Sequence, residues 1–442
     1  MNPHSAPVSY EQLLMLRRMA QSPHPTAYIT AVRIVLSGPL DAEMLHRSID
    51  ALAMRHHALR TRFVAGADGG WSQAVDEPRP VRYDEHDFTG LAPDERDAGI
   101  RALVEDFTER PFDIAEGHLL RTALVHTGPD RWELLLAYHH LIVDGWSLRI
   151  LLQDVSALYA AEAGGPAPAA VQSQPADHAR AQRQDVDREQ RVSGLRHWLD
   201  VLGDRSQLLD LPADFPRPAG FIGRGEAHSF TLGREPHEGV RRLAGQCGVT
   251  PFVVLASAVA VLMCRLTGRG DIVLSVPFFN RTAEYERVVT CMAGPLLLVC
   301  EVRPGDSFTD LVERTGDRFF TALEHSGVPF TDLLDTLVAE RGWTRQDPPT
   351  VAVAMQNYGL DDALTLPGVS AETHFESLQV AYTDLVLNLT DTGEGVDGVA
   401  VYRSELLRAE TVADWTRKLA VLVADLVTEP GAPLTEASLV RG

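Results

Sequence analysis

The chain has 442 residues, of which 45% are hydrophobic and 23% charged, as is ordinary for a globular protein long enough to form two lobes. Its formal net charge of −21 argues against nucleic acid or an anionic membrane as a partner, because both require a basic face. The four cysteines, Cys247, Cys264, Cys291 and Cys300, form no CxxC pair. We therefore expect reduced core thiols in a soluble, cytoplasmic protein, with neither a zinc ribbon nor a disulfide framework.

The first part of the chain alternates strand and helix signals. β-Branched and aromatic residues predict a strand over Tyr28–Leu36, and Asp41 is placed to cap the helix that follows. Two apolar runs, Leu119–Val125 and Trp132–Tyr138, flank a turn that contains Gly and Pro, which predicts a hairpin. Apolar residues at helical spacing then predict a helix over Ser147–Tyr159.

A polar stretch from Glu162 to about Gly194 separates the two halves of the chain and is interpreted as a connection, part loop and part polar helix. In the second half, Thr250-Pro251 begins a helix that is apolar nearly all round and too short to span a bilayer, so we expect it in the core. Further strands are predicted over Ile272–Val276, Leu296–Val302, Val351–Met355, Leu385–Leu389 and Val396–Tyr402. An amphipathic helix around Trp415 closes the chain.

These signals predict an α/β protein of two similar lobes. We place the first lobe at residues 1–170, the connection at 171–195 and the second lobe at 196–442.

The segment best suited to chemistry is His139-His140-Leu141-Ile142-Val143-Asp144-Gly145, at the end of a predicted strand. Successive strand residues point to opposite faces, so only one of the two imidazoles can face a given cavity. Histidine can accept a proton at neutral pH, and Gly145 permits a substrate to approach the backbone closely. The alternative is a core histidine beside a surface histidine, followed by an ordinary turn. A metal site is disfavoured because no third ligand stands at a recognisable spacing.

The longer stretch Tyr138–Ser147 resembles the HHxxxDG motif of nonribosomal peptide synthetase condensation domains. Three other segments are similar to segments of that family and occur in the same order: Arg55–Phe63 (RHxxLRTxF), Thr250–Phe252 with Leu266–Gly268, and His325–Phe330 (HxxVPF). The resemblance extends over nearly the whole chain.

The resemblance implies two chloramphenicol-acetyltransferase-like lobes in a V-shaped pseudo-dimer, with the active site between them. It implies that His140 orients or deprotonates the attacking nucleophile and that His139 is structural. Asp144 would shape the site through a salt bridge, for which Arg281 is the best partner in this sequence, and the amide of Gly145 would help to hold the oxyanion.

The resemblance also implies an enzyme of natural-product biosynthesis that transfers a carrier-bound acyl or aminoacyl thioester to an amine or hydroxyl. Trp146, Ser147 and Asn357 are expected to line the substrate tunnel. The expected partners are a donor peptidyl carrier protein, which supplies the phosphopantetheine arm, and an acceptor carrier protein or soluble nucleophile. No permanently bound cofactor, metal, nucleic acid or membrane is expected. Because the chain runs from Met1 to Gly442 with no adenylation or carrier region, we expect a free-standing enzyme, with an excised module as the alternative.

Other readings of the resemblance differ in their motifs. The order Trp146-Ser147 distinguishes the chain from epimerisation domains, and the two histidines distinguish it from heterocyclisation domains, which carry aspartates. A coenzyme-A- or carrier-dependent acyltransferase of the same fold and a non-catalytic recruitment module stay open. The chain departs from the family at Glu11-Gln12, where Ala-Gln is usual, around Asp177, where aromatic residues are missing, and within 294–298, where an Asn-Thr pair is replaced. These departures leave the substrate class open.

Overall fold

The computed structural model describes residues 5–67, 69–184, 188–203, 209, 211–218, 220, 222–343, 350–360, 362–376 and 380–434. The chain forms two compact units. The first contains Met1–Val186, Arg281–Ala293 and Tyr358–Gln379, and the second contains Asp187–Asn280, Gly294–Asn357 and Val380–Gly442.

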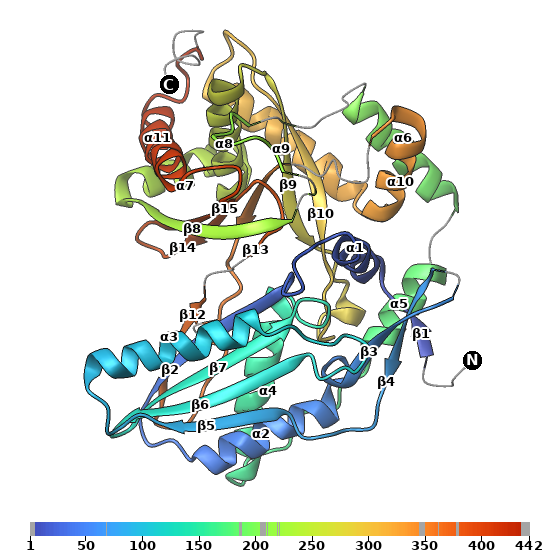
Figure 1. Ribbon diagram of the computed structural model, residues 1–442. Helices are drawn as coiled ribbons and strands as arrows, with labels where there is room; N and C mark the ends of the chain where they lie inside the picture. Colours follow the sequence, from blue (N-terminus) through green and yellow to red (C-terminus); the bar gives the residue numbers. More distant parts are fainter. Residues whose placement is uncertain are drawn as a thin grey trace. The chain divides into compact units, whose positions relative to one another are not determined.

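The described helices and strands of the first unit are β1 (Ser5–Pro7), α1 (Tyr10–Met19), β2 (Ile29–Ser37), α2 (Ala42–Arg55), η1 (His57–Arg60), β3 (Thr61–Ala65), β4 (Trp71–Val75), β5 (Arg82–Asp87), α3 (Pro93–Glu109), β6 (Leu120–Gly128), β7 (Arg131–His139), α4 (Gly145–Glu162), α5 (Pro175–Gln184), η2 (Ala283–Tyr285) and β12 (Ser370–Phe375). They include a five-stranded sheet of order β12-β2-β7-β6-β5 and a small sheet of order β1-β4-β3. Figure 1 shows α3 on one face of the five-stranded sheet and α2 and α4 on the other.

The described helices and strands of the second unit are α6 (Arg188–Leu202), β8 (Gly223–Leu232), α7 (Arg234–Cys247), α8 (Pro251–Thr267), β9 (Asp271–Phe279), β10 (Ala293–Glu301), α9 (Phe308–Glu324), α10 (Phe330–Arg341), β11 (Val351–Met355), β13 (Val380–Ala381), β14 (Leu385–Asp391), β15 (Val396–Arg403) and α11 (Ala409–Thr428). The strands form one sheet of order β10-β9-β11-β14-β15-β8-β13, against which α8 packs among α7, α9 and α11.

Local sequence explains why the predicted elements form where they do. The Asp41 side chain accepts a hydrogen bond from the Met44 amide and caps α2, and Pro251 stands at the start of α8, where no amide donor is needed. From Val253 to Cys264 every residue of α8 is buried, as its apolar character predicts. The α/β class, the two-part organisation and the hairpin of β6 and β7 are confirmed.

The division of the chain differs from the expected boundaries at 170 and 195. Two stretches of the expected second lobe, Arg281–Ala293 and Tyr358–Gln379, belong to the first unit. The reason is long-range pairing: β12 runs antiparallel to β2 over six residue pairs and so completes the first sheet. The expected connection is helical in α5 and at the start of α6, and its residues 185–187 lie outside the described part of the chain.

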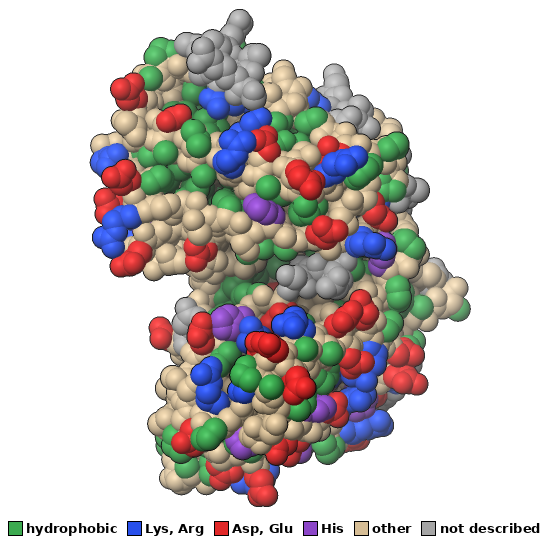
Figure 2. Space-filling view, turned by 60° about the vertical axis from the view of Figure 1, so that its left-hand side comes forward, with side chains coloured by type: hydrophobic (Ala, Val, Ile, Leu, Met, Phe, Trp, Pro, Cys, Tyr) green, Lys and Arg blue, Asp and Glu red, His purple; other side chains and the backbone are tan. Residues whose placement is uncertain are grey.

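The cysteines and the surface complete this description. All four cysteines are free, three of them buried and Cys247 half-buried. Among the described residues no single helix is long and apolar enough to cross a membrane. Helices α7 and α8 together have the length and apolar composition of a membrane span, but the pair is bent by 108° at its junction. Figure 2 shows acidic, basic and apolar side chains interspersed over the face that it presents.

Candidate active site

The two motif histidines stand at the end of β7, which pairs with β2 and β6 at the centre of the first sheet. His139 is the last residue of the strand, and the amide of His140 donates a hydrogen bond of 2.7 Å to the carbonyl of Tyr28. Tyr28 has a φ of 70°, a left-handed conformation that costs an aromatic residue about 1–3 kcal/mol and that surrounding contacts must offset. This turn in the chain places an acceptor directly opposite the His140 amide.

His139 is a buried, neutral residue. Its side chain is 1% exposed, and its Nδ1 accepts a hydrogen bond of 3.1 Å from the Leu141 amide, so the ring proton is on Nε2. Burial, helped by the neighbouring His140, lowers the pKa of His139 to about 3. The ring also meets Phe112 edge-on, with 6.4 Å between ring centroids. These contacts suit a residue that fixes the strand end.

His140 has different surroundings, as strand alternation predicts for neighbouring residues. It keeps partial solvent exposure, while its Nδ1 is buried with no hydrogen-bond partner among the described residues. Burial lowers the pKa of His140 below its ordinary value, although the negative charge of Asp144 opposes this shift. The imidazole is therefore neutral near pH 7 and able to accept a proton.

Asp144 and Arg281 form a buried ion pair. Nη2 of Arg281 lies 2.9 Å and 3.1 Å from the two carboxylate oxygens, and the two side chains are 5% and 1% exposed. Oδ1 also caps α4 by accepting from the Ser147 amide at 2.8 Å, and Oδ2 accepts from the Met292 amide at 2.9 Å. Both oxygens are thus occupied by protein donors, which suits a structural carboxylate better than a proton carrier.

Ser147 and Trp146 bind the same segment, Arg281–Ala293, to the start of α4. The Ser147 hydroxyl donates to the Thr290 carbonyl at 2.7 Å and accepts from the Thr290 amide at 3.1 Å. The Trp146 indole donates to the Glu286 carbonyl at 3.1 Å. Ser147 was expected to contact the substrate, but it is completely buried and its hydroxyl is occupied by protein; Trp146 keeps exposed surface.

The Arg281–Ala293 segment is bonded to α4 a second time, two to three turns further along the helix, at Asp154. This buried carboxylate accepts from Arg55 at 2.6 Å and His56 at 2.7 Å through Oδ2, and from Arg287 at 2.7 Å through Oδ1. Arg55 and His56 begin the RHxxLRTxF-like segment, so its first two residues serve to hold α2 against α4.

Gly145, the first residue of α4, is in close contact with Tyr358. A Cβ atom added at Gly145 would lie 2.6–2.9 Å from three atoms of the Tyr358 ring, closer than non-bonded carbon atoms approach. The sequence predicted that this glycine admits a substrate to the backbone, whereas in the structure the close neighbour is a tyrosine ring of the same unit. Tyr358 therefore provides a steric reason for glycine at this position.

We predict that Gly145→Ala lowers the free energy of unfolding by about 1–3 kcal/mol, the usual cost of overpacking. In a Tyr358→Ala background the added methyl group has room, so the same change should cost less, with a coupling of about 1–3 kcal/mol in a double-mutant cycle. Urea denaturation of the unmodified chain, the two single variants and the double variant measures this coupling free energy. Gly245→Ala is the matched control, because its added Cβ meets no atom within 4 Å apart from its chain neighbours and its own helix backbone. An equal cost of Gly145→Ala in both backgrounds would exclude the steric explanation.

Asn357 lies in the second unit, two residues beyond the end of β11. Its side chain is exposed, and its Oδ1 accepts a hydrogen bond of 3.2 Å from the Asp391 amide at the end of β14. The residue expected to line the tunnel is thus bonded to the end of β14, an interior strand of its own sheet.

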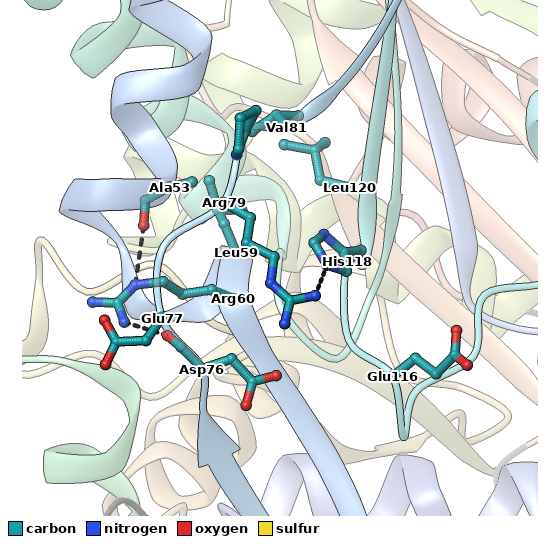
Figure 3. Close-up of a pocket in the computed structure, with 11 residues that line it drawn as sticks. Ala53, Leu59, Arg60, Asp76, Glu77, Arg79, Val81, Glu116, His118 and Leu120 are labelled. Atoms are coloured by element: carbon teal, nitrogen blue, oxygen red, sulfur yellow. Dashed lines mark hydrogen bonds between the residues drawn. The ribbon is translucent and has the colours of Figure 1, made fainter.

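A separate small cavity in the first unit is shown in Figure 3, where the side chains of Arg79 and His118 face each other 3.4 Å apart. Its volume is about 10 Å³, room for about one water molecule, and no residue of the histidine motif lines it. Among the described residues no group of three or more His, Cys, Asp or Glu side chains is arranged to hold a metal ion.

Gln12, Tyr28 and Tyr358 are among the residues of this site that were not predicted from the sequence. Gln12 was noted only as part of a departure from the family pattern, yet its buried amide bonds the Leu141 carbonyl. Tyr28 opens a predicted strand and carries no signal for a positive φ, and Tyr358 lies more than 200 positions from the glycine that it covers. None of these contacts leaves a local pattern in the sequence.

Comparisons with known proteins agree with this architecture. The family model described as Condensation domain matches residues 2–441. The chain is 31% identical over 417 residues to chondramide synthase cmdD of Chondromyces crocatus, covering 94% of this chain but 11% of that protein. It therefore spans a small part of this relative.

Two solved structures share the fold. The starter condensation domain of rhizomide synthetase RzmA, a mutant in complex with C8-CoA and Leu-SNAC, is 20% identical, with a TM-score of 0.85 and coverage of 98% of this chain and 96% of that one. SgcC5 of Streptomyces globisporus, in complex with a naphthyl ethanediol, is 22% identical, with a TM-score of 0.81 and coverage of 97% and 100%. Because this family model matches nearly every residue, the chain belongs to the condensation domain family.

Proposed function

We propose that this chain is an acyltransferase that joins an acyl or aminoacyl thioester, carried by a peptidyl carrier protein, to an amine or hydroxyl. The observation that supports this most is the state of His140: a neutral, partly exposed imidazole whose backbone is fixed by Tyr28 and whose neighbours are held by a buried ion pair. Such an imidazole is suited to orienting or deprotonating a nucleophile.

In the proposed reaction the nucleophile attacks the thioester carbonyl, and His140 accepts its proton. The tetrahedral intermediate then collapses with cleavage of the C–S bond, and the proton passes to the departing thiolate. The products are an amide or ester and a carrier with a free thiol. An amine has a substantial neutral fraction near pH 8 and needs less help than a hydroxyl, for which a general base matters more.

The other motif residues take supporting roles in this proposal. His139 holds the strand end as a neutral group, and Asp144 with Arg281 maintains the turn into α4. The amide of Gly145 stands at the amino-terminal end of α4, where free N–H groups favour negative charge, and so we assign it to the oxyanion. Trp146, which retains exposed surface, is our candidate for contact with the incoming arm.

The proposed donor carries its acyl group on the phosphopantetheine arm of a carrier protein, and no bound cofactor takes part. The acceptor is a second carrier protein or a soluble nucleophile. A coenzyme-A-dependent acyltransferase is the second candidate, because the RzmA domain of the same fold was solved with C8-CoA.

The experiment that tests this proposal compares two donors that carry the same acyl group. Octanoyl carrier protein and octanoyl-CoA are each incubated with the chain and with Leu-SNAC or a 1,2-diol, and products are measured by mass spectrometry. We expect product from the carrier-bound donor at a kcat/KM at least tenfold above that for the CoA thioester, since the protein part of the donor adds binding energy. Preference for the CoA donor would support the second candidate. No product from a panel of acyl and aminoacyl carriers would favour a recruitment module.

A further inference from the structure

Gln12 lies in the first turn of α1 and is 1% exposed. Its backbone amide donates to the Ser9 hydroxyl at 3.1 Å, and its Oε1 accepts from the Ser9 amide at 2.9 Å, which together form a capping box. Because an amide donor faces Oε1, the opposite end of the carboxamide is the NH2 group. The orientation of this side chain is therefore set by the helix that carries it.

The two N–H bonds of Gln12 point to two different parts of the candidate active site. Nε2 donates to the Leu141 carbonyl at 3.1 Å and to the Thr290 hydroxyl at 3.2 Å. Leu141 directly follows His140. Thr290 binds Ser147 through its backbone, and its carbonyl lies 3.1 Å from Nη2 of Arg281. One buried amide thus joins the strand end that carries His140 to the segment that carries Arg281.

The backbone around His140 is consequently held on both sides. Before the ring, the His140 amide donates to the Tyr28 carbonyl; after it, the Leu141 amide donates to His139 and the Leu141 carbonyl accepts from Gln12. The Gln12 contact ties this peptide to α1, an element outside the sheet. Removing it would leave a buried carbonyl and a buried hydroxyl with lost partners.

We propose that Gln12 is a positioning residue for His140. It sets the peptide that follows the imidazole relative to the Arg281–Ala293 segment, and so fixes the direction in which the ring meets a nucleophile. The inference rests on the proposed function, because it assigns Gln12 a part in the same reaction. It predicts that loss of the two N–H donors lowers turnover rather than donor binding.

The chain supplies a matched control for the loss of a buried amide. Gln73 on β4 is completely buried, and its Nε2 donates to the Pro7 carbonyl at 2.8 Å, within the small sheet of the same unit. Gln73→Met and Gln12→Met remove the same group at similar volume from equally buried sites. A general loss of stability would affect both variants, whereas a positioning role affects only the second.

We expect Gln12→Met to lower kcat by about 10- to 100-fold with an unchanged KM for the carrier-bound donor, the effect of a small misplacement of a reacting group. Amide hydrogen exchange over residues 139–145 should be about tenfold faster, as expected when one hydrogen bond is lost. Gln73→Met should change neither. Gln12→Glu keeps the acceptor for the Ser9 amide but lacks both N–H donors, so it should show the same loss of kcat. If Gln12→Met does not fold, Gln12→Glu tests the positioning role in its place.

Two results separate this inference from the proposed function. If the unmodified chain is active and Gln12→Met and Gln12→Glu behave like Gln73→Met in both kcat and exchange, Gln12 is not a positioning residue. If the unmodified chain transfers no acyl group while exchange over 139–145 still rises in the Gln12 variants alone, the proposed function fails and the structural role of the amide stands.

Discussion

Replacing His140 by alanine is expected to lower kcat/KM for a hydroxyl acceptor by about 10²- to 10⁴-fold, the usual contribution of a general base. For an amine acceptor the loss should be smaller, because the neutral amine already has a free lone pair and needs the imidazole mainly for orientation. The two acceptors are to be compared with the same carrier-bound donor. Small and equal losses with both would contradict a base role.

The pH dependence provides a second measurement on the same variant. Burial holds the pKa of His140 below its ordinary value of 6.5, so the ring stays neutral, and competent as a base, at pH values where an exposed histidine is already protonated. We therefore expect the acid limb of kcat/KM for the hydroxyl acceptor to lie below pH 6.5 and to be absent in His140→Ala. His374→Ala, at a histidine on β12 that is 36% exposed, is the control and should retain the limb.

Replacing Arg281 by methionine is expected to lower the free energy of unfolding by about 3–5 kcal/mol, because it leaves the Asp144 carboxylate buried without its counter-ion. The pair is almost inaccessible to water, with side chains 5% and 1% exposed, so solvent cannot compensate for the lost charge. Since Arg281 also binds Ser147 and Thr290, turnover should fall with stability.

Chemical denaturation measures this effect against a half-exposed ion pair of the same unit. Arg62 and Asp76 are 3.0 Å apart, but their side chains are 32% and 34% exposed, so Arg62→Met should cost no more than about 1 kcal/mol. Adding Asp144→Asn to Arg281→Met removes the unpaired charge while keeping a residue that can cap α4, and should recover part of the loss. If Arg281→Met is no more harmful than Arg62→Met, the ion pair does not stabilise the site.

The lining of the candidate site comes from distant parts of the chain. Arg281 reaches Asp144 across 137 positions, and Gln12 reaches Leu141 across 129. No periodicity or spacing in the sequence predicts such contacts. The pairing of Asp144 with Arg281 was predicted from the resemblance to a family and not from the residues, whereas Gln12 and Tyr358 were not predicted at all.

The position of Ser147 illustrates the same limit. The resemblance implied that Ser147 contacts the substrate, but in the structure the Arg281–Ala293 segment covers the start of α4, and the Ser147 hydroxyl donates to the Thr290 carbonyl of that segment. For Gly145 the sequence predicted close approach of a substrate, whereas the close neighbour in the structure is the ring of Tyr358, which follows β11 in a different part of the chain.

The sequence by itself determined the α/β class, the hairpin of β6 and β7, the capped start of α2, the buried helix α8 and the histidine segment at a strand end. These follow from periodicity, capping residues and turn residues, all of which act within a few positions. Tertiary structure alone decided that Arg281–Ala293 and Tyr358–Gln379 join the first unit, in which Arg281–Ala293 and Tyr358 contact the start of α4. Those stretches are placed by strand pairing with β2, by a buried ion pair and by side-chain packing, which depend on three-dimensional proximity rather than on neighbours in the chain.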